Sequence, residues 1–386
     1  MEWSLYYIFH KYINKIFGLR ERLWFNMLVL KKIGKIVKCF FLILLSVLLL
    51  GVLVIFIVNK IATAKEMSML EKEGYLKLVS VGDYSLNVYD YGNKQGKHTL
   101  VFISGQGVHD YSITMSKVSD QLAVDNRIVY VDRAGYGLSD DTKVPQTNEN
   151  IVNDYRTALK NAGIEGPYIL IPHSLGGAYA THWQSNYPEE IEGVVFVDCT
   201  ELNENVFFDD ETPAFESNAQ TALCKLGFFR LAVDYCFDPL PNNYTDREKE
   251  ISHALNVHYG WSNAAASEEK YASQNCISAF KDCKTNDIPK VYISSSNAHL
   301  TKECIIEELE WSNQILAKGA DPQSLTDEFI EERLKAEEVQ RETVLKPYLK
   351  KMGNCDLVLL GGSHDIYMQK PDEVAQIIKD FIAGIE

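Results

Sequence analysis

Short apolar runs and amphipathic stretches alternate along most of the chain. Gly82-Asp83, a pair typical of a hairpin turn, separates the first two runs. The runs predict eight strands, at 75–81, 84–91, 99–104, 127–132, 167–172, 193–198, 289–295 and 356–360. Stretches with helical spacing predict helices at 110–123, 148–162, 175–187 and 371–384. Because strands that alternate with helices form βαβ units, we expect an α/β fold with a mostly parallel eight-stranded sheet and helices on both faces.

The alternation stops between 199 and 288, where aromatic residues such as Phe228, Phe229 and Trp261 are frequent. We interpret this segment as a helical cap inserted into the fold. The core is then expected to consist of residues 75–198 and 289–386. Many of the aromatic side chains are expected simply to pack the protein interior.

An unbroken run of twenty residues without a charged side chain covers 39–58. As a helix it is long enough to cross about 30 Å of hydrocarbon, so we expect a membrane anchor. The basic segment 1–38 precedes it and a linker, 59–74, is expected to follow. Four lysines just before the run place the N-terminus in the cytoplasm by the positive-inside rule, and the catalytic part outside. The alternative is a secretory signal cleaved after Ala64, which would release the rest of the chain.

Charge divides the chain in the same way. The formal net charge is −15, but residues 1–60 carry nine Lys and Arg against two Glu, so the rest carries −22. An acidic domain lacks the clustered cations that neutralise phosphates, which argues against a nucleic-acid partner. No zinc-type Cys/His spacing or phosphate-binding loop is present, so we expect no metal ion. Local disulfides are conceivable between Cys224 and Cys236 and between Cys276 and Cys283, as is a fully reduced set.

Candidate chemistry begins with Ile171-Pro172-His173-Ser174-Leu175-Gly176-Gly177, between a predicted strand and a predicted helix. A tight strand-to-helix turn projects a serine hydroxyl away from the backbone, and small residues relieve the crowding. The usual pattern is Gly-x-Ser-x-Gly, and here Pro172 replaces the first glycine. Ser174 is therefore the candidate nucleophile.

A second motif, Asp132-Arg133-Ala134-Gly135-Tyr136-Gly137-Leu138-Ser139-Asp140, follows the preceding strand. Together with the serine turn it resembles the α/β-hydrolase superfamily, over about residues 75–386. The resemblance implies an α/β-hydrolase fold without a cofactor, and a scaffolding role for Asp132 and Arg133. A dinucleotide site is excluded because no third glycine follows at the required position.

Two backbone amides are needed to stabilise the oxyanion of acyl transfer. Leu175, after the serine, provides one by position. The resemblance implies that the other lies in the loop after the third strand, Ser104-Gly105-Gln106-Gly107, where Gln106 is the candidate.

Serine also needs a base. Gly361-Gly362-Ser363-His364, before the Pro371-Asp372-Glu373-Val374 helix start, resembles the C-terminal segment of the superfamily and makes His364 the candidate. Many relatives place the acid after the strand expected at 289–295, but Ser294-Ser295-Ser296-Asn297 stands there. Some members use the end of the preceding strand instead, which gives Asp198. Glu201 and Glu303 are the alternatives.

These residues predict a membrane-anchored serine hydrolase that cleaves a carboxylic ester or a lipid-like acyl bond. The aromatic cap favours an apolar substrate, and the anchor favours a lipid ester. Aminopeptidase, C–C hydrolase and acyltransferase activities use similar parts. A degenerate protein that binds a ligand or partner without turnover is the other alternative.

Overall fold

The computed structural model describes residues 2–208, 214–236, 240–315 and 325–385. It contains an eight-stranded sheet in the order β1-β2-β4-β3-β5-β6-β7-β8. β1 pairs antiparallel with β2 and β2 with β4, while every other pairing is parallel. The predicted α/β fold is therefore confirmed. The strands are β1 (Leu78–Ser80), β2 (Ser85–Gly92), β3 (Thr99–Ile103), β4 (Arg127–Val131), β5 (Tyr168–Pro172), β6 (Ile191–Val197), β7 (Lys290–Ser294) and β8 (Cys355–Leu359).

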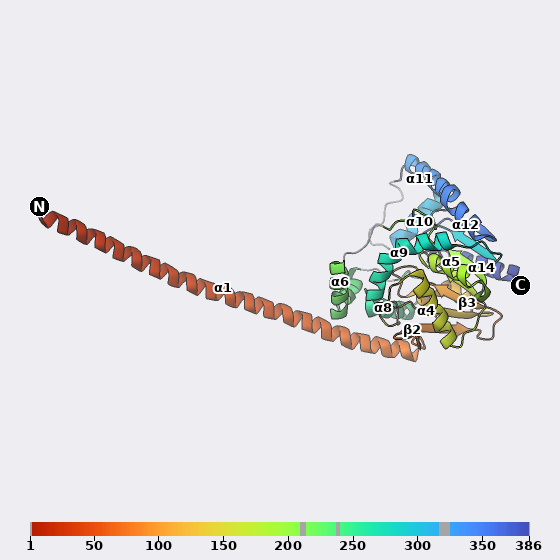
Figure 1. Cartoon of the computed structure of the whole chain (residues 1–386), viewed down its shortest axis with the longest axis horizontal. Coiled ribbons are helices and arrows are strands. Elements are labelled where there is room, and N and C mark those ends of the chain that lie inside the picture. Colours follow the sequence, from red (N-terminus) through yellow and green to blue (C-terminus); the bar gives the residue numbers. More distant parts are fainter. Residues whose placement is uncertain (1, 209–213, 237–239, 316–324, 386) are drawn as a thin grey trace. The chain divides into compact units, whose positions relative to one another are not determined.

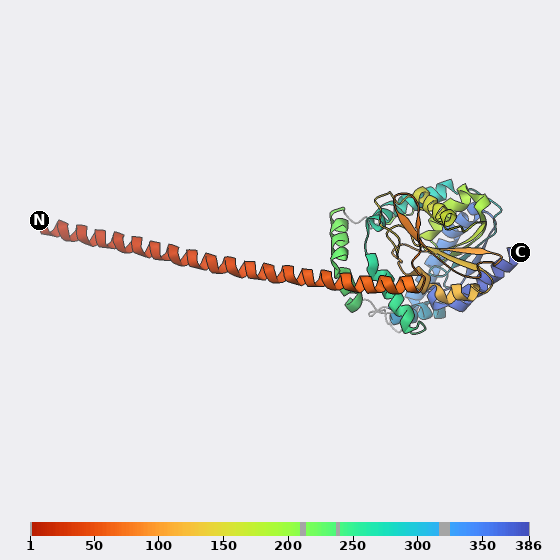
Figure 2. The same cartoon turned by 90° about the horizontal axis from the view of Figure 1, so that it is seen from below.

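Helices cover both faces of the sheet (Figure 2). α4 (Asn148–Asn161), α5 (Gly176–Asn186) and α12 (Lys346–Met352) pack on one face. α3 (Ser116–Leu122) and α14 (Pro371–Ile385) pack on the other. The central strands are buried along their whole length, as in β5, which explains why they appear in the sequence as continuous apolar runs.

The predicted cap segment contains α6 (Ala214–Leu226), α7 (Phe228–Cys236), α8 (Asp246–Tyr259) and α9 (Asn263–Asp282), labelled in part in Figure 1. Its residues 209–213 and 237–239 lie outside the described ranges. α9 packs against α5 of the core. A further helical group, α10 (Lys302–Ile315), α11 (Asp327–Gln340) and a π-helical turn (Arg341–Leu345), precedes α12. Shorter helices are α2 (Tyr111–Thr114), η1 (Pro188–Glu190) and α13 (Ile366–Gln369).

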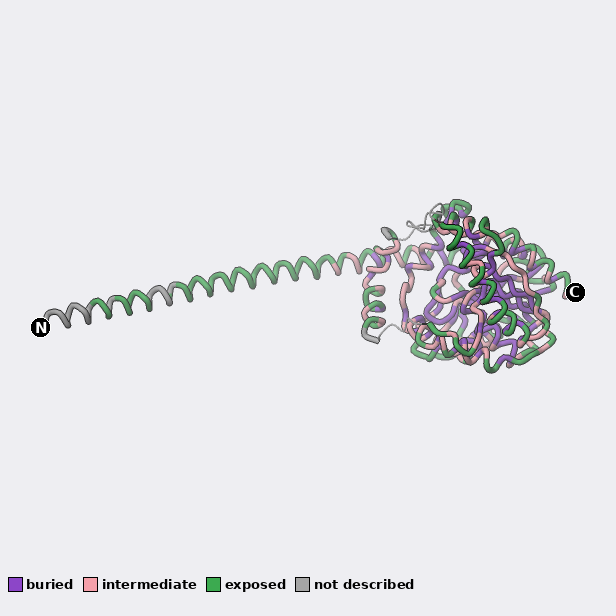
Figure 3. Tube along the Cα trace, turned by 90° about the horizontal axis from the view of Figure 1, so that it is seen from above, coloured by how far each residue is buried: buried purple, intermediate pink, exposed green. Residues whose placement is uncertain are grey.

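The chain divides into two compact units, Met1–Val58 and Asn59–Glu386. Within the first, residues 39–58 are mostly exposed apolar side chains, drawn green in Figure 3. Helix α1 (Glu2–Lys72) contains a segment that is apolar and long enough to cross a membrane by length and composition.

The first fourteen residues of the second unit, 59–72, belong to the expected linker 59–74 but continue helix α1. They pack against the cap segment. Arg230 of α7 donates to Asn59 Oδ1 at 2.8 Å and to both carboxylate oxygens of Glu66 at 2.6 and 2.7 Å. A Cβ on Gly227 would lie 2.6 Å from the Cβ of Asn59, so the α6–α7 turn touches this helix directly. Leu70 is completely buried.

Cysteine pairing is settled for the described thiols. Cys276 and Cys283 are both free, and Cys224 is free as well. The side chain of Cys236 lies outside the described residues. The disulfide considered between Cys276 and Cys283 is therefore wrong, since both thiols are free and buried.

Candidate active site

Ser174 sits in a tight turn between β5 and α5. Its φ of 52° lies in the left-handed region, which is costly for a residue with a side chain. The turn is closely packed on both sides. A Cβ on Gly176 would lie 2.7 Å from the carbonyl oxygen of Ile103, and one on Gly177 would lie 2.6 Å from the Cβ of Cys199. The sequence therefore needs glycine at both positions, whereas Pro172 is accommodated as the last residue of β5.

Asp198 and His364 are brought together from segments 166 residues apart. The imidazole Nδ1 of His364 lies 2.7 Å from Asp198 Oδ2. Because an ionised carboxylate can only accept, Nδ1 carries the proton and donates it, which leaves Nε2 as an acceptor. Asp198 follows β6 with a φ of 40° and is almost fully buried, while the His364 side chain is half exposed.

The serine run after β7 supplies hydrogen-bond donors to Asp198. The amides of Ser295 and Ser296 donate to Oδ1 at 2.6 and 3.1 Å, and the Ser296 hydroxyl donates to Oδ2 at 2.7 Å. Ser295 also donates through its hydroxyl to the Ser363 carbonyl, next to His364. These serines were not expected to have a role at the site. The available signal was the position of the serines at the end of a strand next to β6.

The two alternative acids have other surroundings. Glu201 accepts a hydrogen bond from Gln340 at 2.8 Å. Glu303 is exposed in the first turn of α10. Among the residues that the structure describes, Asp198 is the carboxylate that contacts the His364 ring.

The pKa values of Asp198 and His364 are shifted in opposite directions. Burial favours neutral Asp198, but the hydrogen bond with His364 and the charge on that ring lower the Asp198 pKa overall. Burial likewise disfavours a charged His364, yet the hydrogen bond to Asp198 and its negative charge raise the His364 pKa above its usual range. The carboxylate thus stays ionised while the imidazole is held ready to accept a proton.

His173 connects the serine turn to the His364 segment. Its Nε2 lies 3.0 Å from the His364 carbonyl oxygen, and the two rings have centroids 4.6 Å apart. Burial and the neighbouring His364 lower the His173 pKa, so this ring is neutral and Nε2 donates to the carbonyl. His173, which directly precedes Ser174, therefore holds the backbone of the His364 loop next to the serine turn.

The 104–107 loop lies against Ser174. A Cβ on Gly105 would be 2.8 Å from the Cβ of Ser174 and 3.4 Å from its Oγ, so glycine is required for this approach. Within the described part of the chain, neither the Gln106 amide nor the Leu175 amide donates to a protein acceptor. Both predicted oxyanion donors are therefore available in the turns that flank Ser174.

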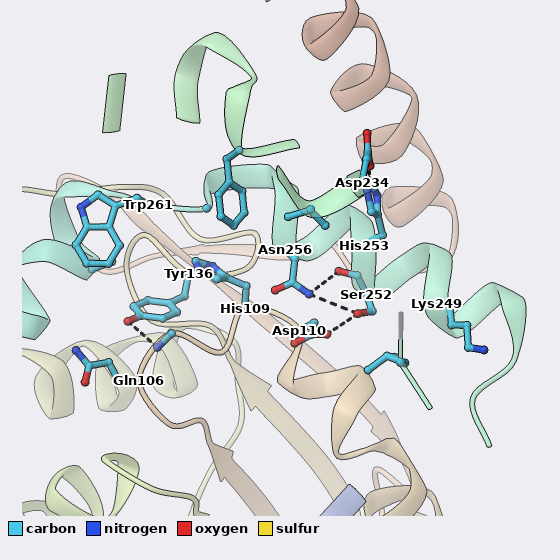
Figure 4. Close-up of a pocket in the computed structure, with 16 residues that line it drawn as sticks. Gln106, His109, Asp110, Tyr136, Asp234, Lys249, Ser252, His253, Asn256 and Trp261 are labelled. Carbon is cyan, nitrogen blue, oxygen red and sulfur yellow. Dashed lines mark hydrogen bonds and ion pairs between the residues drawn. The ribbon is translucent and has the colours of Figure 1, made fainter. Parts of the chain in front are cut away.

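A cavity of about 570 Å³ adjoins the 104–107 loop (Figure 4). Gln106 and Tyr136 lie at one end beside Trp261, while His253 and Lys249 of α8 lie toward the other. Phe229, Val233 and Leu240 add apolar wall from the cap segment. One polar pair in the wall is Ser252, which donates to the buried carboxylate of Asp110 at 2.5 Å. The cavity thus combines apolar walls with a few fixed polar groups.

Parts of this sequence are similar to known proteins. A family model described as "Serine aminopeptidase, S33" matches residues 95–200, which hold the 104–107 loop, the serine turn and Asp198. The uncharacterized protein YbdG of Bacillus subtilis is 25% identical over 360 residues, which cover 92% of this chain and all of YbdG. The α/β hydrolase domain-containing protein VTE7 of Arabidopsis thaliana is 28% identical over 116 residues, covering 29% of this chain and 35% of VTE7.

Solved structures share the fold at low sequence identity. Cfl2 of Burkholderia cenocepacia aligns with a TM-score of 0.54 and 16% identity, covering 79% of this chain and 94% of that one. The enol-lactonase of Burkholderia xenovorans aligns with a TM-score of 0.52 and 15% identity, covering 80% of this chain and all of that one. With the eight-stranded sheet, these similarities show an α/β-hydrolase fold, and residues 95–200 match the serine aminopeptidase family model within it.

Proposed function

We propose that this hydrolase cleaves a carboxylic ester or a lipid-like acyl bond through a covalent acyl-enzyme. Ser174 is the nucleophile, His364 the general base and Asp198 the acid that orients the base. The observation that carries the proposal is the Asp198–His364 hydrogen bond beside a serine held at a strained positive φ. Strain of this kind persists where the surrounding structure enforces it, and here it presents the serine hydroxyl.

In the first step, the Ser174 oxygen attacks the acyl carbon and its proton passes to His364 Nε2. The negative charge that develops on the acyl oxygen is stabilised by the amides of Gln106 and Leu175. His364 then gives the proton to the departing alcohol, and the acyl group remains on Ser174. Asp198 stays ionised throughout and stabilises the imidazolium.

In the second step, water replaces the alcohol. His364 accepts a proton from the water as the hydroxide adds to the acyl carbon, and returns it to the Ser174 oxygen as the acid leaves. Ser174 Oγ makes no hydrogen bond within the described residues, which fits an unliganded site because such contacts tighten when substrate binds.

The cavity supports an apolar substrate. Phe229, Val233, Leu240 and Trp261 provide walls for an acyl or aryl group beside Gln106. The apolar helix over 39–58 supports a second part of the proposal, that the enzyme is anchored in a membrane with its catalytic unit on the extracytoplasmic side. The anchor would then hold the catalytic unit near lipid esters of the membrane.

An active-site fluorophosphonate tests the proposal directly. The full chain in detergent is expected to be labelled, and Ser174→Ala is expected to abolish labelling because the reagent needs an activated serine. Ser80→Ala, a change to an exposed serine on β1, is the matched control and should label as the wild type does. Absence of labelling in a folded wild-type chain would support the alternative of a binding protein without turnover.

Substrate class is decided by a panel of p-nitrophenyl esters of increasing acyl length, with aminoacyl anilides included. The anilides are included because the matching family model is described as a serine aminopeptidase. We expect turnover of the esters. Cleavage of the anilides alone would replace the esterase proposal by a peptidase.

A further inference from the structure

A buried carboxylate on the cap segment reaches the core beneath the 104–107 loop. Glu268 of α9 is 1% exposed. Its Oε1 lies 2.8 Å from Arg133 Nε, in an ion pair, and accepts from the Tyr179 hydroxyl at 2.6 Å. Its Oε2 accepts from the Tyr136 hydroxyl. Desolvating two charges is expensive, so a buried pair of this kind persists only with further hydrogen bonds, which the two tyrosines supply.

Arg133 passes this contact on to the backbone of the loop. Nη1 donates to the Ser104 carbonyl at 2.7 Å and to the Ser104 hydroxyl at 3.0 Å. Nη2 donates to the Gly105 carbonyl at 2.7 Å. With Nε 2.8 Å from Glu268 Oε1 and both terminal nitrogens bonded to the loop, the planar guanidinium cannot rotate without breaking several contacts at once.

The Gly105 carbonyl has a particular relation to the proposed oxyanion donor. It belongs to the same planar trans peptide group as the Gln106 N–H, and in such a group the two bonds point in opposite directions. A donor fixed on the Gly105 oxygen therefore fixes the direction of the Gln106 N–H. It also polarises the peptide, which makes that N–H a stronger donor.

Tyr136 holds the next peptide. Its hydroxyl accepts from the Gly107 amide at 3.2 Å while it donates to Glu268. The peptide groups on both sides of Gln106 are thus committed to one network that ends on Glu268.

We propose that Glu268 is a positioning residue that aligns the Gln106 amide for oxyanion stabilisation through Arg133 and Tyr136. The proposal rests on the serine-hydrolase function proposed above. It assigns to the cap segment a part in the chemical step as well as in enclosing the cavity. The sequence offers no local sign of it, because Glu268 lies in an ordinary polar stretch of a helix about 135 residues after Arg133.

Glu268→Gln tests the proposal, because glutamine keeps the size of the side chain but removes the charge. The measurement is the rate of fluorophosphonate labelling of the full chain at increasing reagent concentration. It gives the maximal rate constant kinact and the half-saturating concentration KI. The phosphoryl oxygen of the reagent occupies the oxyanion position. Losing an oxyanion donor costs roughly 100- to 1000-fold, so a misaligned one should lower kinact by roughly 10- to 100-fold, with KI nearly unchanged.

A matched control separates positioning from stability. Glu190 forms an ion pair with Arg156 of α4 at 2.6 Å and accepts a hydrogen bond from Trp183 of α5, and neither partner belongs to the Glu268 network. Glu190→Gln should lower the unfolding temperature but leave kinact as in the wild type. A folded Glu268→Gln chain whose kinact equals that of Glu190→Gln would overturn the proposal.

If Glu268→Gln does not fold, Tyr136→Phe carries the test, because it removes one hydroxyl and keeps the ring. A net hydrogen bond is worth about 1 kcal/mol, so kinact should fall by about 5-fold or more. An unchanged kinact would overturn the proposal. Failure of the proposed function is a different result, namely a wild-type chain that is not labelled at all.

Discussion

Asp198, the proposed acid at the end of β6, is held in place by its neighbours. The carboxylate accepts hydrogen bonds from Ser295, Ser296 and His364, and the backbone of Asp198 has a φ of 40°. Asp198 could be proposed from the sequence because a carboxylate at the end of a buried strand is visible there. The contribution of the serines could not, because a serine run is typical of an ordinary turn until the strand order places β7 beside β6.

Asp198→Asn is expected to reduce ester turnover by roughly 10⁴-fold, because the amide favours the wrong tautomer of His364. The pH profile should change as well. Asp198 raises the His364 pKa, and the base must be neutral to work, so wild-type kcat/KM rises as pH passes that raised pKa. Without the charge the pKa falls, and the acidic limb moves to lower pH.

Glu201→Gln is the comparison for this prediction, since Glu201 is a nearby carboxylate bonded to Gln340 rather than to His364. It should leave the acidic limb in place. If Asp198→Asn keeps both the wild-type rate and the wild-type limb, the acid must be assigned elsewhere.

Elements were predictable where burial is uniform. The ends of β3 to β7 lie within two residues of the expected ranges, because strands buried along nearly all of their length leave continuous apolar runs. The helix expected at 110–123 is instead two helices, α2 and α3, that meet at Met115. Apolar periodicity continues across such a junction, so it gives no sign of the break.

The helix over 59–72 was harder to predict, because its partners lie far along the chain. Arg230 is buried where α7 meets this helix and bonds to Asn59, Thr63 and Glu66. A side chain whose partners lie 164 to 171 residues away leaves no local pattern. The ion pair between Glu268 and Arg133 likewise joins distant parts of the chain and leaves no local pattern.

Arg230→Leu should destabilise the Asn59–Glu386 unit, because it leaves the Glu66 carboxylate half-buried without its counter-charge. Breaking one side of a buried pair costs about 3–5 kcal/mol, and partial exposure of Glu66 reduces this to about 2–3 kcal/mol. Thermal unfolding measures the change. Arg247→Leu, which removes the exposed pair with Glu73, should have a much smaller effect. Equal shifts in the two variants would contradict the buried role of Arg230.

At the scale of the whole molecule, the compact unit begins at Asn59, inside a continuous helix. The alternation of strands and helices was sufficient to predict the mostly parallel eight-stranded sheet and the helices around it. The boundary was not predictable, since residues 59–74 are polar enough to look like a linker. Their contacts to the cap segment, through Asn59, Glu66 and Leu70, are what makes them part of the folded unit.

A chain that starts at Asn59 should therefore remain folded and react with the fluorophosphonate, whereas one that starts at Glu73 should unfold at a lower temperature. The second chain loses fully buried Leu70, worth about 1.5–3 kcal/mol, together with the partners of Arg230. Differential scanning calorimetry of both chains gives the comparison. Similar unfolding temperatures would show that residues 59–72 contribute little.

The location of Asp198 also limits how the site can change during evolution. An Asp introduced at Ser295 or Ser296 would bring a second negative charge into contact with the first, and two carboxylates this close cannot both ionise. Loss of Asp198 before that change would leave His364 without an acid. Moving the proposed acid from one strand to the next therefore passes through an impaired variant in either order. Single substitutions are expected to change the present arrangement only rarely.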